Sequence, residues 1–150
     1  MRVVFSVNSE KVILLAEDSP DDEMAFKHAF RQSGFDNPVI VVRDGDETIA
    51  YLKGKGRFAD RDNFPLPKAL ILDLILPKRT GWQVLEWLRS QPEFNDLFVV
   101  VLTGSFQPGD LQNAYEMGAN SFLRKPCRSQ DLVELADAFP EHWAHSLVVA

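Results

Sequence analysis

Five short apolar runs alternate along the chain with segments that carry the signals of a helix start and a helix end. Several runs lack the polar and apolar alternation of a half-exposed strand and are typical of strands covered on both faces of a parallel sheet. A buried helix segment can look the same, so the segments between the runs decide the question. The runs are Val12–Ala16, Val39–Val42, Ala69–Leu72, Leu97–Leu102 and Ser121–Leu123.

The intervening segments are predicted to be helices. After the first run, Ser19 supplies an N-cap, Pro20 a first helical residue, and Asp21 and Asp22 acid in the first turn, before Gly34 ends the segment. This alternation predicts an α/β domain with a central parallel sheet and helices on both faces. Comparable helical segments are 46–53, 82–90, 108–117 and 129–145, and the long connection 54–67 is expected to be an ordered surface loop.

Composition excludes several classes of function. The 150 residues, 45% of them hydrophobic, suffice for one domain with a core of its own. A formal charge of −6 argues against binding to nucleic acid or an anionic membrane surface, which both select basic proteins. Cys127 is the only cysteine, so no internal disulfide forms. No run approaches the ~20 apolar residues of a membrane span, and no signal peptide is evident, so a cytoplasmic location is expected.

Polar residues follow the apolar runs where the strands of a parallel sheet would end. Ligands of open parallel sheets bind outside the carboxyl ends of their strands, so these residues are expected to converge. They are Glu17 and Asp18 after the first run, Asp73 after the third, Thr103 after the fourth and Lys125 after the fifth.

Carboxylates gathered in this way repel one another unless a cation joins them. Oxygen ligands favour a hard ion such as Mg²⁺, which then accepts an oxyanion such as a phosphoryl group as a further ligand. Asp73 would be the nucleophile, with Lys125 and Thr103 on the phosphoryl oxygens. Singly, Asp18 and Thr103 could be helix caps and Lys125 a surface residue, but their joint placement favours function.

These residues resemble the receiver domain of two-component response regulators. The resemblance implies a flavodoxin-like, doubly wound, five-stranded parallel sheet with strand order 2-1-3-4-5, a phosphohistidine donor on a sensor histidine kinase, and a requirement for Mg²⁺. It covers residues 11 to about 145, so 1–10 are expected to be an N-terminal extension and 11–150 the receiver domain. Residues 1–8 are read either as an added edge strand or as a loosely held terminus. The matching segments are 13–18, 70–77, 100–104, 118–119 and 122–126.

The resemblance also implies a role for each site residue. Asp73 would be the phosphoacceptor, Asp18 a direct metal ligand, Glu17 a ligand through water and the Ile75 carbonyl a further ligand. Thr103 and Phe122 would form the switch pair, in which the hydroxyl moves to the phosphate and the ring turns inward. The Lys125-Pro126 peptide bond would be cis, as is usual in relatives.

Two positions depart from the family pattern. Ile75 stands where a polar residue often follows the phosphoacceptor, and Thr80 stands where many relatives have aspartate before Gly81. An apolar side chain beside the acyl phosphate is expected to hinder the attacking water and to lengthen the life of the phosphorylated form. The change at Thr80 is expected to affect only a turn.

The expected function is that of a single-domain response regulator, similar to those paired with phytochrome-like histidine kinases. Such a protein catalyses only its own phosphorylation and dephosphorylation, so it is not expected to be an enzyme in the ordinary sense. Its output would be docking to a downstream protein. The face formed by the fourth helix, fifth strand and fifth helix, with Phe122 and Trp143, is where relatives dimerise or meet partners. Trp143 is more simply interpreted as a core anchor of the last helix.

Two alternatives remain open at the level of sequence. A phosphatase or phosphotransferase could also use Asp73, but a haloacid-dehalogenase-type enzyme would carry a second aspartate where Ile75 stands. A flavodoxin-like cofactor binder would share the fold class. However, Glu17 and Asp18 would repel a phosphate at the first turn unless a metal intervened. Turnover of a phosphomonoester would favour the first alternative, and a coloured protein the second.

Overall fold

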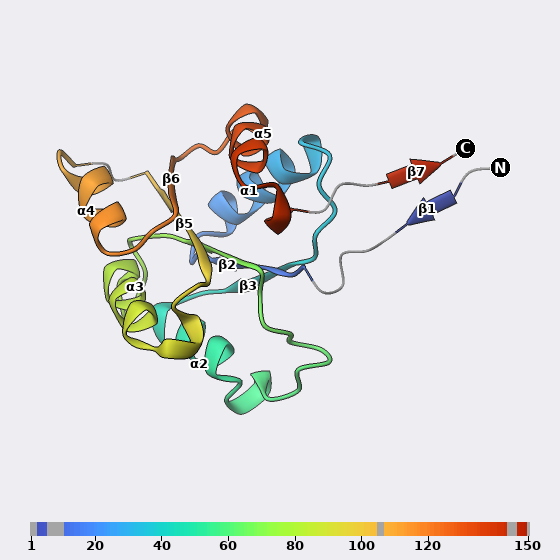
Figure 1. Cartoon of the computed structure of the whole chain (residues 1–150). Coiled ribbons are helices and arrows are strands. Elements are labelled where there is room, and N and C mark those ends of the chain that lie inside the picture. Colours follow the sequence, from blue (N-terminus) through green and yellow to red (C-terminus); the bar gives the residue numbers. More distant parts are fainter. Residues whose placement is uncertain (1–2, 6–10, 105–106, 144–146, 150) are drawn as a thin grey trace.

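The computed structural model describes residues 3–5, 11–104, 107–143 and 147–149, and within them strands and helices alternate as predicted (Figure 1). The strands of the central sheet are β2 (Ile13–Ala16), β3 (Val39–Val42), β4 (Ala69–Leu72), β5 (Phe98–Thr103) and β6 (Ser121–Arg124). The helices are α1 (Pro20–Gln32), α2 (Gly45–Lys53), α3 (Gly81–Ser90), α4 (Asp110–Glu116) and α5 (Ser129–Ala138). Short 3₁₀ helices are η1 (Gly56–Phe58), η2 (Pro92–Phe94) and η3 (Pro140–His142).

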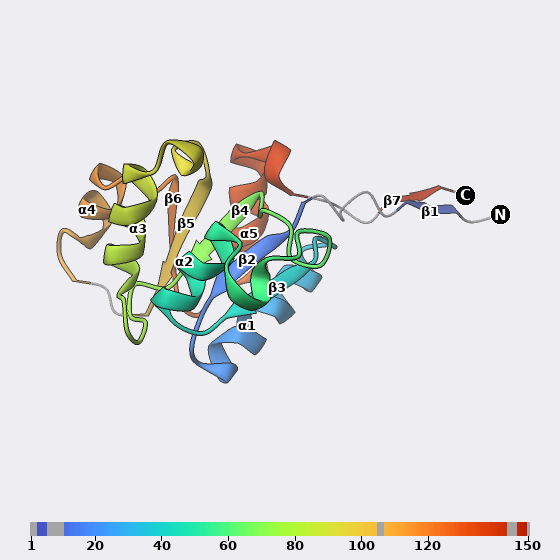
Figure 2. The same cartoon turned by 90° about the horizontal axis from the view of Figure 1, so that it is seen from below.

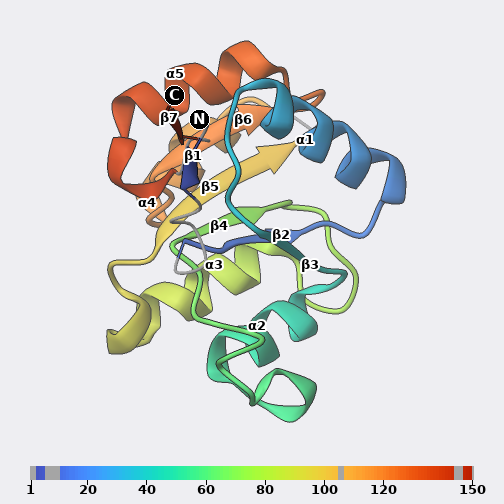
Figure 3. The same cartoon turned by 90° about the vertical axis from the view of Figure 1, so that its right-hand side faces the viewer.

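The five strands form one parallel sheet in the order β3-β2-β4-β5-β6. Counted among these five strands, this is the predicted order 2-1-3-4-5, so the fold class is confirmed. Helices α1 and α5 cover one face, and α2, α3 and α4 cover the other (Figures 2 and 3). Strands β2 and β4 are fully buried, which explains their lack of alternation. No helix of the described residues is long and apolar enough to cross a membrane.

The helix starts follow the capping residues of the sequence. The Ser19 hydroxyl accepts from the Asp22 amide, and the Asp44 carboxylate accepts from the Glu47 amide. Thr80, the residue that departs from the family pattern, forms a capping box with Gln83 at the start of α3. The threonine that stands here in place of the family's aspartate therefore caps a helix.

The predicted last helix, 129–145, was too long. Helix α5 ends at Ala138, because Pro140 lacks the amide hydrogen that a continuing helix requires, and η3 follows. Trp143 lies after the helices, buried against the rings of Phe30 and Phe35, with centroids 6.0 and 5.7 Å away. The prediction of a core anchor is confirmed, but Trp143 does not lie on the last helix. Residues 144–145 of the predicted helix lie outside the described residues.

The connection between α2 and β4 is ordered by the guanidinium of the half-buried Arg61, in agreement with the prediction for 54–67. Arg61 donates to the carbonyls of Tyr51 and Leu52 at 2.9 and 2.8 Å and to that of Phe64 at 3.0 Å. The rings of Tyr51, Phe58 and Phe64 pack together beneath it. The loop is thus an extension of the core.

Arg89 ties three segments together at the amino end of the sheet. Its guanidinium donates to the carbonyls of Gly118, Phe94 and Leu97, at 2.8, 2.9 and 2.8 Å. We expect Arg89→Met to lower the free energy of unfolding by about 3 kcal/mol, because three partly buried carbonyls lose their donor. Urea denaturation measures this. The matched Arg57→Met, which removes an exposed ion pair, should change stability little, and equal effects of the two would contradict the role of Arg89.

Candidate functional site

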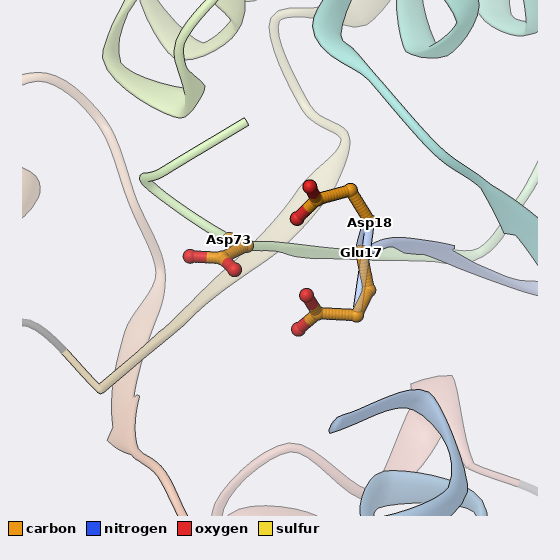
Figure 4. A group of neighbouring side chains, drawn as sticks. All are labelled: Glu17, Asp18 and Asp73. Carbon is orange, nitrogen blue, oxygen red and sulfur yellow. The ribbon is translucent and has the colours of Figure 1, made fainter. Parts of the chain in front are cut away.

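Three carboxylates meet at the carboxyl edge of the sheet. Glu17 and Asp18 follow β2, and Asp73 follows β4, its neighbour in the sheet. One ligand oxygen from each lies within 4.8 Å of the others, and Figure 4 shows the side chains of Glu17 and Asp18 extending toward the side on which Asp73 lies. Glu17 and Asp73 are buried and Asp18 is exposed. Three oxygen donors at this separation can share one divalent cation.

Lys125 contributes the positive charge of this cluster. It follows β6, and its Nζ lies 2.5 Å from Oε1 of Glu17, 2.8 Å from Oδ2 of Asp73 and 2.9 Å from Oδ2 of Asp22. Its peptide bond to Pro126 is cis. One ammonium therefore faces three carboxylates, with the carboxylate of Asp18 close by.

The negative charge of the cluster exceeds the single positive charge of Lys125, so a further cation can bind there. Burial raises the pKa of Glu17 and the charge of Asp73 adds to this, while hydrogen bonds from Lys125 and the Ser19 amide oppose it. Burial alone would lower the pKa of Lys125, but its hydrogen bonds to Asp73, Glu17 and Asp22 outweigh that effect and raise it. Lys125 thus stays charged, while the carboxylates still outnumber the cation.

The remaining predicted residues, except Phe122, line the same hollow, which has a volume of about 260 Å³. Thr103 lies there at the end of β5 and is buried. Ile75 lies at its mouth, 60% exposed, with its amide donating to Oδ1 of Asp73 at 3.0 Å. Phe122 lies on β6 beside β5 and lines a neighbouring hollow, half-buried against the core. The metal-ligand, phosphoacceptor and switch roles of these residues stay predictions.

Two residues of the site were not predicted from the sequence. Asp22 was read only as acid in a helical first turn, yet it lies one turn after Asp18 and bonds to Lys125. Gly81 was read only as part of a turn. A Cβ there would come within 2.2 Å of the Asp73 carbonyl oxygen, so α3 can start against the end of β4 only at a glycine. For Asp22, the available signal in the sequence was its position one helical turn after Asp18.

Comparisons with known proteins agree with this arrangement. The model of the response regulator receiver domain family matches residues 13–137. The response regulator Rcp1 of Synechocystis is 33% identical over 142 residues, which cover 95% of this chain and 95% of Rcp1.

Solved structures show the same likeness in three dimensions. The Mn²⁺-bound form of Rcp1 has a TM-score of 0.72 at 35% identity and covers 86% of this chain and 93% of that one. The phosphorylated cyanobacterial phytochrome response regulator RcpA has a TM-score of 0.73 at 32% identity, with coverage of 89% and 94%.

Proposed function

The chain belongs to the response regulator receiver domain family, and from this premise we propose that it is a switch that accepts a phosphoryl group on Asp73 from a sensor histidine kinase. The observation that carries the proposal is the convergence of Glu17, Asp18 and Asp73 with Lys125 in one hollow at the sheet edge. The relatives supply independent support, since one of them is a phosphorylated protein and another holds a divalent ion.

The mechanism follows from the positions of the side chains. An Asp73 carboxylate oxygen attacks the phosphorus atom as the bond from phosphorus to the donor histidine nitrogen breaks, so an acyl phosphate forms. A Mg²⁺ ion, held by Glu17, Asp18, Asp73 and the Ile75 carbonyl, would neutralise charge on the incoming group. Lys125 exchanges part of its contact with Asp73 for a phosphoryl oxygen, and Thr103 donates to another. Withdrawal of Thr103 toward the phosphate then frees space for Phe122.

The proposed partners follow from the same site. The donor kinase is proposed to be of the phytochrome type, because RcpA is described as a phytochrome response regulator. The output is docking of a downstream protein, or of a second copy, to the face formed by α4, β6 and α5, next to Phe122. No small-molecule substrate is turned over, so the protein is not an enzyme in the ordinary sense. A cytoplasmic location stays a prediction.

Labelling with a small phosphodonor tests the proposal. Incubation with acetyl phosphate and Mg²⁺ should add one phosphoryl group per chain, seen as a single increment in intact mass. EDTA should prevent it. Steady hydrolysis of p-nitrophenyl phosphate without a labelled chain would instead support a phosphatase. Labelling that survives EDTA unchanged would contradict the metal-assisted mechanism.

Ile75 offers a prediction on the lifetime of the phosphorylated form. Its exposed apolar side chain lines the hollow beside Asp73, where it would hinder an attacking water. We expect Ile75→Asn to release phosphate about tenfold faster, a barrier change of ~1.4 kcal/mol, because an amide can orient that water. The decay of the labelled mass after removal of the donor measures this. Val133→Asn, a matched change on α5, should leave the decay unaltered; unchanged decay in Ile75→Asn would sink the hypothesis.

A further inference from the structure

Asp18 has the fewest contacts of the three clustered carboxylates. Glu17 and Asp73 are buried and each pairs with Lys125, whereas Asp18 is exposed. Its side chain extends toward the side on which Asp73 lies (Figure 4). Within the described part of the chain, no hydrogen bond or ion pair holds the Asp18 carboxylate. Its position therefore depends on the backbone that joins β2 to α1 on either side of it.

The side chain of Arg43 connects the two segments that flank Asp18. Arg43 follows β3, the neighbour of β2 in the sheet. Its Nη1 donates to the main-chain carbonyl of Glu17 at 3.3 Å, and its Nη2 forms an ion pair with Oε1 of Glu23 in the first turn of α1. One guanidinium thus ties the residue before Asp18 to the helix that begins after it.

Glu23 is fixed in place for this contact. Its Oε2 accepts from Nζ of Lys27, one helical turn along α1, at 2.6 Å, so the two carboxylate oxygens have different partners. The hydrogen bond from Lys27 lowers the pKa of Glu23, burial opposes this, and a hydrogen bond from Arg43 adds to the lowering. Only the planar fork of an arginine can donate to a carbonyl and a carboxylate at once in this way, because a lysine carries a single ammonium.

We propose that Arg43 is a positioning residue for the divalent ion: it fixes the link between β2 and α1 and thereby presents the Asp18 carboxylate to the ion shared with Asp73. This role rests on the proposed function, which supplies the ion. The charge of Arg43 acts in the opposite direction, because a cation beside Glu17 repels a divalent cation. Positioning and charge therefore predict opposite changes in Mg²⁺ affinity when the side chain is removed.

Calorimetric titration of the full chain with MgCl₂ separates the two effects. Arg43→Met should weaken Mg²⁺ binding about fivefold, because the link that carries Asp18 loses its tie to α1. Lys27→Met is the matched control: it also removes one positive charge that pairs with Glu23, but it leaves the contacts of Arg43 intact. Its Mg²⁺ affinity should stay within about twofold of the parent. Arg43→Lys keeps the charge without the fork and should recover only part of the affinity.

The rate of labelling by acetyl phosphate gives a second readout. At a Mg²⁺ concentration equal to the parent dissociation constant, Arg43→Met should be labelled about threefold more slowly, since fewer chains hold the ion. Saturating Mg²⁺ should restore the parent rate, because Asp73 and Lys125 are unchanged. A merely structural role of Arg43 would not produce this dependence on Mg²⁺.

The outcomes separate this role from the proposed function. Circular dichroism should show an unchanged fold in Arg43→Met, since the Arg43 side chain is 45% exposed. Unchanged or tighter Mg²⁺ binding by Arg43→Met would overturn the positioning role, and so would an equal loss of affinity in Lys27→Met. Either result would leave the proposed function standing. A parent chain that binds no Mg²⁺ would overturn the metal-assisted function and the positioning role together.

Discussion

Asp73→Asn should abolish the uptake of a phosphoryl group from acetyl phosphate, with a loss of at least about a hundredfold in rate. The amide is not a nucleophile toward phosphorus, and it removes one of the three carboxylates that lie within 4.8 Å of one another. Intact mass after incubation with acetyl phosphate and Mg²⁺ measures the effect. The variant should remain folded, because an amide keeps the size of the carboxylate and accepts one hydrogen bond from Lys125.

A matched control makes this prediction sharp. Asp46→Asn, on the surface of α2, makes the same chemical change away from the cluster and should take up the phosphoryl group at the parent rate. If Asp73→Asn were labelled as fast as Asp46→Asn, the phosphoacceptor would lie elsewhere. Labelling at another carboxylate, located by peptide mapping, would identify that residue.

Lys125→Met should have the second large effect, and the size of its effect on stability should depend on the metal. In EDTA, loss of the ammonium leaves Glu17 and Asp73 without their cation, and stability should fall by about 3 kcal/mol. Saturating Mg²⁺ should restore most of this stability, because the ion replaces the missing charge and binds without competition from the ammonium. Phosphoryl uptake should still fall about a hundredfold, because a donor to the transferred group is gone.

Urea denaturation with and without Mg²⁺ measures the change in stability, and the labelling rate measures the change in phosphoryl uptake. Lys78→Met is the matched control, because Lys78 is exposed and its Nζ lies 3.5 Å from Asp44, outside the cluster. It should change neither quantity appreciably. A Lys125→Met variant that is labelled at the parent rate in Mg²⁺ would remove the lysine from the mechanism.

Much of the fold could be predicted because its signals are local. Continuous apolar runs mark strands buried on both faces, and Ser19 marks a helix start by capping. The caps at Asp44 and Thr80 were not predicted. The sheet order came from the resemblance, since no local pattern says which strands are neighbours. The predicted end of the last helix at residue 145 was wrong, although Pro140 within it signals an earlier end.

The site was partly predictable for a different reason. In a parallel sheet the residues after each strand must meet at one edge, so Glu17, Asp73 and Lys125 could be grouped from their positions alone. Asp22 could not, because its contact with Lys125 depends on where α1 lies over the sheet edge. Strand β1 (Val3–Phe5) pairs with β7 (Leu147–Val149) and not with the five-stranded sheet, so the edge strand expected within 1–8 forms with another partner. This pairing joins the two ends of the chain, and no local signal specifies such a contact.

The most direct measurement is the position of Mn²⁺ in a crystal of the full chain, found by its anomalous scattering. The proposal predicts one ion within ligand distance of the Asp18 and Asp73 carboxylates. Anomalous density elsewhere on the molecule, or none between these carboxylates at saturating Mn²⁺, would contradict the proposal that a shared divalent ion prepares Asp73 for phosphorylation.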